Sequence, residues 1–339
     1  MFFYMLQLIY MRKIDQNDKN VTLKDIAKAL NLSVNAVSRA LRDTDDISKE
    51  TKEKVKKKAE DMGYIPNTFA SDLKRGISKQ VAIIFNDFYN PYFPLFCNKT
   101  FNNLQSQGYE GAVIFCKSNY LNLEHIKNYN VNKYCAIITF IEPTAEVAFF
   151  FKKRNIPLIL VGINPSTTMI DCVYTDDFLG GQLAGKYFVD GPRQKALYVT
   201  DSFSETTYRR FSGFSEAIRN NTLNKTLDII PYSKELNIIE AAYRKIKDEN
   251  IDFVFCHCDS LAIGLMSYIG RKKYGGKITV VGFDNLHKYN PINLKITSID
   301  YDMDAIIDYT VNALIGKMNG NIDINKQIKK VFSVNISEK

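Results

Sequence analysis

The stretch NLSVNAVSRAL, residues 31–41, carries side chains that are unusual for their setting. A surface helix normally presents charged residues to solvent. This stretch instead presents hydroxyl and amide groups, a single arginine (Arg39) and no acidic residue. Such groups form hydrogen bonds but are weak acids, bases and nucleophiles, so the question is which polar partner they face.

Positive charge is denser around this stretch than elsewhere. Residues 1–76 carry 15 Lys and Arg against 11 Asp and Glu, and the other 263 residues carry 30 against 26. Half of the net charge of +8 therefore lies in the N-terminal fifth of the chain. This distribution indicates a polyanionic partner for that region.

Motifs for catalysis are absent from the sequence. No GxGxxG follows a strand-like run, and there is no GxxxxGK[ST], HExxH or GxSxG. The three histidines, His125, His257 and His287, do not lie beside a plausible nucleophile. The Gly-Gly pairs at 180–181 and 275–276 are interpreted as ordinary turn or helix-start features. We predict that the protein is not an enzyme and uses no cofactor.

The six cysteines are scattered through apolar runs, which is typical of reduced, buried thiols in a cytosolic protein. Only Cys256-His257-Cys258 resembles a ligand cluster. In a strand, the two cysteines would share one face and His257 would point away from it. Structural metal sites usually need four convergent ligands, so we predict a buried strand and no metal here.

The first ten residues, MFFYMLQLIY, are apolar but too few to span a membrane, which takes about 20 residues. The basic residues that follow them stand on the wrong side for a signal peptide. We expect residues 1–20 to be an N-terminal extension, with Met11 as an alternative true start. We expect a cytoplasmic protein with no membrane segment.

Residues 21–66 contain three short helical patterns. Thr22 can cap the first, and Asp25 completes a capping box with it. After a one-turn break, Ser33 can cap the second, and Ser48 the third. Two helices joined by a tight turn, followed by a third, predict an all-α helix-turn-helix domain.

The rest of the chain shows different sequence patterns. Residues 67–77 hold about two turns of helical pattern, too short to be stable alone, which we interpret as a hinge helix. In residues 78–339, apolar strand-like runs such as VAIIF and IPLILVG alternate with amphipathic helical patterns. This alternation predicts parallel α/β sheets, and its length suits two lobes.

Together these motifs match a known pattern. VTLKDIAKALNLSVNAVSRALRD, then ISKETKEKVKKKAEDMGYIPN, closely resembles the DNA-binding headpiece of the LacI/GalR family of bacterial transcriptional regulators. NPYF, YRRFSGF, DSLAIG and VVGFDN follow in the order found in that family. The resemblance extends from about Val21 to the C-terminus. It implies a helix-turn-helix headpiece and a two-lobed α/β core like that of periplasmic binding proteins.

For the headpiece, the resemblance implies binding to double-stranded DNA. A recognition helix would read bases through Arg39 on guanine, Asn35 on adenine and Val34 on a thymine methyl. Implied phosphate contacts, which position without specifying, are Thr22, Ser33, Ser38, Ser48, Thr51, Tyr64 and Asn67. In the hinge, the resemblance implies DNA contact by Ala70 and Leu73, with Leu73 inserted into the minor groove. The alternatives are a solvated or ion-paired Arg39, plain helix capping, and a Leu73 packed on its own domain.

For the core, the resemblance implies a small-molecule effector, most naturally a sugar, held between the lobes. The implied contacts are Asp87, Asn90, Tyr92, Phe93, Arg210, Tyr232, Asp259 and Asp284. Tyr92 and Phe93 could stack on a sugar or purine ring, with core packing as the alternative. Arg210 matches an arginine that commonly holds effector hydroxyls or anions. Asp284 is the better acidic candidate, because Asp259 can instead cap the helix that it starts.

Departures from the family pattern leave the effector open. Cys258-Asp259 replaces the usual Asn-Asp, which removes an amide donor from the rim of the site. Thr200-Asp201-Ser202 stands where a glycine is usual, and a glycine of the last long helix is replaced near Ile307. These changes concern the ligand and not the fold.

The expected function is a ligand-controlled transcriptional regulator, a repressor of carbohydrate use. The chain ends soon after VFSVNI and carries no heptad-bearing tail, so we expect a homodimer on a pseudo-palindromic operator. Alternatives are a nucleobase or nucleoside effector, and a phosphoprotein co-regulator. A solute-binding protein of the same fold is the rival from another class, but it would need an export signal and would lack the headpiece.

Overall fold

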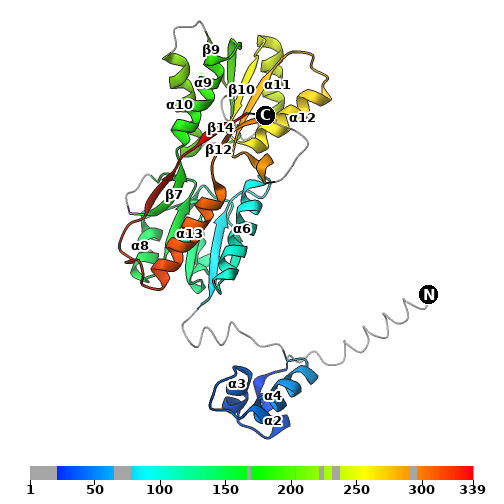
Figure 1. Cartoon of the computed structure of the whole chain (residues 1–339), viewed down its shortest axis with the longest axis vertical. Coiled ribbons are helices and arrows are strands. Elements are labelled where there is room, and N and C mark those ends of the chain that lie inside the picture. The colour runs from blue at the N-terminus through cyan, green and yellow to red at the C-terminus, as the bar shows by residue number, and fades with distance from the viewer. Residues whose placement is uncertain are drawn as a thin grey trace, which may run out of the picture. The chain divides into compact units, whose positions relative to one another are not determined.

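The chain divides into two compact units, Met1–Gly76 and Ile77–Lys339 (Figure 1). A computed structural model describes residues 21–64, 78–165, 169–202, 204–220, 225–230, 237–289 and 296–338. The expected extension and the expected hinge helix lie outside these residues. The same holds for four of the expected site residues, Asn67, Ala70, Leu73 and Tyr232.

The first unit contains three helices, α2 (Leu23–Leu30), α3 (Val34–Leu41) and α4 (Lys49–Asp61). Each begins at the cap that the sequence predicts. The backbone N–H and the hydroxyl of Thr22 donate to Asp25 Oδ2 at 2.8 and 2.7 Å. Ser33 Oγ accepts from the backbone N–H of Ala36 at 3.1 Å, and Ser48 Oγ accepts from that of Thr51 at 3.3 Å. Such caps satisfy backbone N–H groups that have no partner within the helix.

A small apolar core joins the three helices. Its fully buried members include Ile26 from α2, Val37 and Ala40 from α3, and Val55 from α4. Because α3 directs Val37 and Ala40 inward, Ser38 and Arg39, which stand between them in the sequence, turn toward the outer side of the helix. The predicted all-α helix-turn-helix domain is confirmed.

The first lobe of the second unit is built on a parallel six-stranded sheet of order β13-β7-β6-β4-β1-β2. Its strands are β1 (Gln80–Phe85), β2 (Glu110–Phe115), β4 (Ala136–Thr139), β6 (Leu158–Val161), β7 (Asp171–Thr175) and β13 (Lys329–Phe332). Helices α6 (Tyr92–Ser106) and α13 (Met303–Met318) cover one face, and α7 (Leu123–Asn128) and α8 (Ala145–Lys153) cover the other. A short pair, β3 (Tyr120–Leu121) and β5 (Glu142–Pro143), and the 3-10 turn η1 (Val131–Lys133) complete the lobe.

The second lobe repeats this plan with sheet order β14-β12-β11-β10-β8-β9. Its strands are β8 (Lys195–Val199), β9 (Thr226–Ile229), β10 (Phe253–Cys256), β11 (Thr279–Phe283), β12 (Thr297–Asp300) and the antiparallel β14 (Asn335–Ser337). Helices α9 (Asp177–Asp190) and α10 (Glu205–Arg219) cover one face, and α11 (Ile238–Glu249) and α12 (Asp259–Arg271) cover the other. The 3-10 turn η2 (Leu286–Lys288) follows β11.

The alternation of apolar side chains explains why helices cover both faces of each sheet. Along β1, Val81, Ile83 and Phe85 belong to one buried cluster, whereas Ala82 and Ile84 belong to another. Successive side chains of a strand point to opposite faces, so a continuous apolar run needs a cover on both. The predicted two-lobed α/β core is confirmed.

The chain passes between the lobes three times, from β7 to α9, from β12 to α13 and from β13 to β14. Figure 1 shows α6, α8 and α13 in one lobe and α9 to α12 in the other. Because all the parallel strands of a sheet end at the same edge, polar residues that follow them gather there.

Candidate functional site

The outward face of α3 is the first candidate site. Val34 is 41% exposed, and Asn35 is exposed beside it. Ser38 and Arg39 follow one turn later and are partly exposed. This face carries no acidic side chain of its own helix, so a phosphate-bearing partner would meet no repulsion from α3. The expected base-reading residues therefore lie together on one side of one helix.

Arg39 has an ion-pair partner in this structure, the carboxylate of Asp46 in the loop between α3 and α4. An ion-paired Arg39 is one of the alternatives to base contact that the sequence leaves open. The two are compatible, since a guanidinium has five N–H donors and a carboxylate occupies at most two. Sequence reasoning missed Asp46 as a residue of this face.

Most of the expected phosphate-contact residues that the structure describes lie at helix ends, and Ser38 lies inside α3. Thr22, Ser33 and Ser48 each take part in a cap, and the hydroxyls of Ser48 and Thr51 lie 2.9 Å apart. The backbone N–H of Tyr64 closes the end of α4 on Ala59 O at 2.8 Å. The capping role is thus present, and it leaves Thr22, Ser33, Ser48 and Thr51 at helix N-termini, where phosphates are commonly bound, whereas Tyr64 follows the C-terminus of α4.

The second candidate site lies in the core, around Arg210 of α10. Its Nε donates to Asp177 Oδ1 at 2.9 Å, and its guanidinium carbon lies 3.4 Å from the ring centre of Phe283. It also donates to the backbone oxygen of His257. Asp177 begins α9 and accepts a second hydrogen bond, from Thr175 Oγ1 at 3.3 Å. The arginine is therefore held on several sides by elements that meet at the edge of the second sheet.

Two glycines make this arrangement possible, because α9 and α10 pack with their backbones nearly touching. A Cβ on Gly181 would lie 2.1 Å from Arg210 O, and one on Gly213 would lie 2.0 Å from Phe178 O. Any side chain at either position would push the helices apart. Gly181 thus allows the close packing of α9 against α10, a role that its interpretation as an ordinary turn or helix-start feature did not include.

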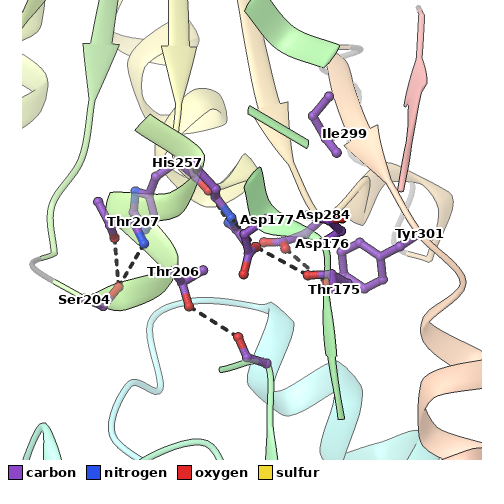
Figure 2. A network of polar contacts seen from close by, with 12 residues as sticks. Thr175, Asp176, Asp177, Ser204, Thr206, Thr207, His257, Asp284, Ile299 and Tyr301 are labelled. Atoms are coloured by element: carbon purple, nitrogen blue, oxygen red, sulfur yellow. Dashed lines mark hydrogen bonds and ion pairs between the residues drawn. The ribbon is translucent and has the colours of Figure 1, made fainter. Parts of the chain in front are cut away.

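Asp284 lies directly after β11 and belongs to the same cluster. Its Oδ1 accepts from the hydroxyl of Tyr301 at 3.1 Å, and its backbone has a φ of +103°, a region that non-glycine residues rarely adopt. Burial raises the pKa of Asp284 to about 6, although Arg210 opposes the shift. Figure 2 shows Thr175, Asp177, Asp284 and Tyr301 close together.

Arg210 stays charged in this setting. Burial by itself lowers its pKa, but the negative charges of Asp177 and Asp284 outweigh burial and raise the pKa further above its ordinary value. Its positive charge therefore already has two nearby carboxylates. Among the described residues of the cluster, no further cation remains that could balance the charge of a strongly anionic ligand.

Tyr92 and Phe93 come from the first lobe, at the start of α6. The ring of Phe93 stacks on that of Phe85 with centres 5.3 Å apart and meets that of Phe140 edge to face at 5.2 Å. Burial raises the pKa of the Tyr92 hydroxyl, and Asp284 adds to that shift. Tyr92 thus lies near the acidic group of the opposite lobe, as expected of a residue at the boundary between lobes.

Three other expected contacts have structural partners. Asp87 Oδ1 accepts from the backbone N–H of Tyr89 at 2.7 Å, and Asn90 Oδ1 accepts from that of Tyr92 at 3.0 Å, so both shape the turn before α6. Asp259 is fully buried; its oxygens accept from Ser298 Oγ at 2.6 Å and from the backbone N–H of Leu286 at 2.7 Å. Both carboxylate oxygens of Asp259 therefore already accept hydrogen bonds from within the protein.

Sequence reasoning missed Asp177 and Tyr301, and it considered His257 only as a metal ligand. His257 follows β10 and places its Nε2 3.5 Å from Asp201 Oδ1. Burial, followed by the charge of Arg210, lowers its pKa to about 3, so its ring is neutral. Cys258 is the N-cap of α12 rather than a strand residue. Within the described ranges, no group of three His, Cys, Asp or Glu side chains could hold a metal ion.

Two surface hollows lie away from this cluster. One, of about 470 Å³, is lined by residues such as Tyr187, Arg193 and Phe253, and the other, of about 420 Å³, by Arg219 and Lys225. Neither includes a residue of the Arg210 cluster. Of the helices described, none is long and apolar enough to cross a membrane.

The chain is similar to known families and proteins in both of its units. Residues 22–67 match the model "Bacterial regulatory proteins, lacI family", and residues 187–335 match "Periplasmic binding protein-like domain". The HTH-type transcriptional repressor PurR of Histophilus somni is 25% identical over 314 residues, which cover 88% of this chain and 92% of that protein. The sucrose operon repressor of Lactococcus lactis is 26% identical over 321 residues, covering 91% and 97%.

The fold is also that of solved regulators. The lac repressor dimer bound to operator and the anti-inducer ONPF superposes with a TM-score of 0.74 at 19% identity, covering 94% of this chain and 98% of that one. At this identity the likeness establishes the fold, over both the headpiece and the core.

Proposed function

Because the chain belongs to the lacI family of bacterial regulatory proteins, we propose that it represses transcription as a homodimer on a pseudo-palindromic operator and answers to a small-molecule effector. The DNA is contacted by the headpiece, and the effector is bound by the Arg210 cluster of the core. The protein acts in the cytoplasm, where that DNA is found. Regulation, not catalysis, is its role.

The observation that carries this proposal is the outward face of α3. Its exposed side chains are apolar, amide, hydroxyl and guanidinium groups, and no carboxylate of the helix stands among them. Val37 and Ala40 hold the opposite side in the headpiece core, which fixes the orientation of this face. A helix of this kind fits the major groove, where Arg39 and Asn35 would meet base edges.

The chemistry of the second cluster favours a neutral effector rich in hydroxyl groups, a sugar. Arg210 is already paired with Asp177, and Asp284 adds a further acceptor. A phosphorylated or carboxylated ligand would bring negative charge to a place whose cation is compensated. A sugar hydroxyl can donate to Asp284 while its ring packs on the aromatic side chains of the first lobe.

A nucleobase or nucleoside is the second candidate. Its flat ring suits Tyr92 and Phe93, and its N–H groups suit an acidic acceptor such as Asp284. The relative named PurR and the relative named for the sucrose operon are both similar to this chain over most of its length. The choice between sugar and base therefore rests on a binding experiment.

Effector binding would be coupled to DNA binding through the lobes. The hydroxyl of Thr206 in α10 donates to Gly162 O at the end of β6 at 3.3 Å, so the second lobe touches the first beside the cluster. A ligand that prefers one lobe arrangement shifts the population toward it. We propose that this shift determines whether the hinge segments of the two subunits can fold together on DNA.

Two experiments test the proposal. In a gel-shift assay with DNA from upstream of the protein's own gene, we expect a complex that weakens steeply as salt rises. The absence of any salt-sensitive complex would contradict DNA regulation. In a thermal-shift screen over neutral sugars, sugar phosphates and nucleosides, we expect a neutral sugar to raise the melting temperature. A response confined to sugar phosphates would contradict the charge argument.

A further inference from the structure

The loop between α3 and α4 carries three acidic residues, Asp43, Asp45 and Asp46, next to the face proposed to bind DNA. Acidic residues this close to bound DNA weaken DNA binding, because they repel phosphate oxygens. We therefore expect these residues to have a structural role that offsets the repulsion. The structure shows that the three carboxylates differ in what they contact.

Asp43 fastens the loop to α4. Its two oxygens lie 3.1 Å from Lys52 Nζ and 3.0 Å from Lys56 Nζ, and its backbone has a φ of +61° just beyond the end of α3. These contacts lower the pKa of Asp43, the bond to Lys56 first among them. Asp43 thus serves the turn between the two helices.

Asp46 is held at a fixed place relative to α3. On one side, the backbone N–H and the hydroxyl of Thr44 both donate to Arg39 O, at 3.3 Å each. On the other side, Ile47 packs against the headpiece core, and its backbone N–H donates to Thr44 O at 3.3 Å. The loop is therefore folded back on the last turn of α3, and the carboxylate of Asp46 pairs with the guanidinium of Arg39.

Asp45 lies between these two residues and is exposed. Among the residues that the structure describes, it forms no ion pair. It has the same charge as Asp46 and lies one residue away, but it does not contact Arg39. Asp45 is therefore a matched control for substitutions of Asp46.

We propose that Asp46 is a specificity-determining residue of the DNA-binding face, which acts by holding the guanidinium of Arg39 in the orientation that reads guanine. This inference rests on the proposed DNA-binding function and names a residue that serves it. Guanine presents O6 and N7 to two parallel N–H groups of an arginine. The guanidinium has five donors, so it can pair with the base on one edge and with Asp46 on another.

An orientation fixed before binding matters because a free arginine side chain loses rotamer freedom when it pairs with a base. With Asp46 in place, part of that loss has already occurred in the unbound headpiece. The same carboxylate repels DNA of every sequence, so non-specific binding is weakened as well. Because this repulsion acts on the correct site and on all other sites alike, only the fixed orientation of Arg39 widens the difference in affinity between them.

The test compares Asp46→Asn with Asp45→Asn in the full-length protein, using a pool of random-sequence DNA duplexes as the probe. Both variants lose one negative charge, so both should bind non-specific duplex more tightly than the wild type. Only Asp46→Asn should lose discrimination at one base pair of each half-site. We expect a loss of about 2- to 5-fold, which is the size of an exposed ion pair.

A variant cycle with Arg39→Ala separates positioning from charge. If Asp46 acts through Arg39, then Asp46→Asn should cause no further loss of base preference in the Arg39→Ala background. Equal base preferences for the two asparagine variants would overturn the proposal, and so would a further loss in that background. A wild-type protein that enriches no sequence would contradict the DNA-binding function itself, which is a different result from unchanged preferences in Asp46→Asn.

Discussion

Asp259→Asn should make the stability of the core less sensitive to pH. In the wild type, the buried carboxyl accepts hydrogen bonds from Ser298 and from the backbone of Leu286. Burial, together with the nearby Asp284, raises the pKa of Asp259 to about 8 from 3.8. An asparagine keeps an acceptor for Leu286 and can donate to Ser298, so it resembles the protonated acid.

The direction follows from proton binding. A folded-state pKa above the unfolded value means that the folded protein binds more protons between the two values, so stability falls as pH rises through that range. For a shift from 3.8 to about 8, the wild type should lose roughly 4 kcal/mol between pH 5 and pH 8 through this group. Asp259→Asn cannot lose a proton and should escape this loss.

The assay is urea unfolding of both proteins at one protein concentration, from pH 5 to pH 8. Groups that do not interact with Asp259 contribute equally to both curves: the pKa of His257 is lowered to about 3, so its contribution rises with pH up to its unfolded pKa, about 6.5. The difference between the two proteins therefore reports the titration of Asp259 together with its coupling to Asp284. It should grow with pH in favour of the variant. Parallel curves would refute the reasoning, since they would mean that Asp259 is ionised throughout.

Three further changes follow from the same contacts. Asp177→Asn removes the carboxylate that is directly paired with the buried Arg210 and should lower the free energy of unfolding by about 3–5 kcal/mol. Asp190→Asn, on the exposed end of the same helix, should change it by less than about 0.5 kcal/mol, and equal effects of the two variants would contradict the buried pair. Gly213→Ala should destabilise the core, because its Cβ would lie 2.0 Å from Phe178 O. Gly270→Ala has no atom within 4 Å of its Cβ and should stabilise α12 by up to about 1 kcal/mol. In thermal melts, the melting temperatures of the two variants should therefore shift in opposite directions from the wild type. Ser33→Ala should cost the headpiece about 1 kcal/mol through the lost cap of α3, measured by circular dichroism; an unchanged melt would mean that the cap bond to Ala36 contributes nothing.

The headpiece could be predicted closely because its signals are local. The caps at Thr22, Ser33 and Ser48 act within three residues along the chain, and Gly63 ends α4 with a φ of +67°. The strands of the core were equally visible where apolar residues run without interruption, since only burial on both faces explains such runs.

The polar cluster of the core could be predicted only in part. Arg210 and Asp284 were expected from the resemblance, but Asp177 is 33 residues from Arg210 and its helix was not singled out. That helix contains Gly181 at a close contact with α10, and glycine weakens the local helical signal. Which carboxylate meets which cation is decided by tertiary packing, which spacing along the chain does not record.

The same limit applies to Asp46. Its sequence neighbourhood shows only an acidic loop, and the contact with Arg39 depends on the two bonds that Thr44 makes to the end of α3. A capping threonine inside a loop is a weak signal on its own. The partner of an exposed arginine therefore has to be taken from the structure.

The most direct test of the account is the ratio of two dissociation constants, for the duplex that the full-length protein selects and for a scrambled duplex of the same length, at physiological salt. A sequence-specific regulator should favour the selected duplex by about 10³-fold or more. In Arg39→Ala, the preference for one base should be lost at one position of the site, and the ratio of the two dissociation constants should therefore fall. Equal affinity for the two duplexes would contradict the claim that the face of α3 reads DNA sequence.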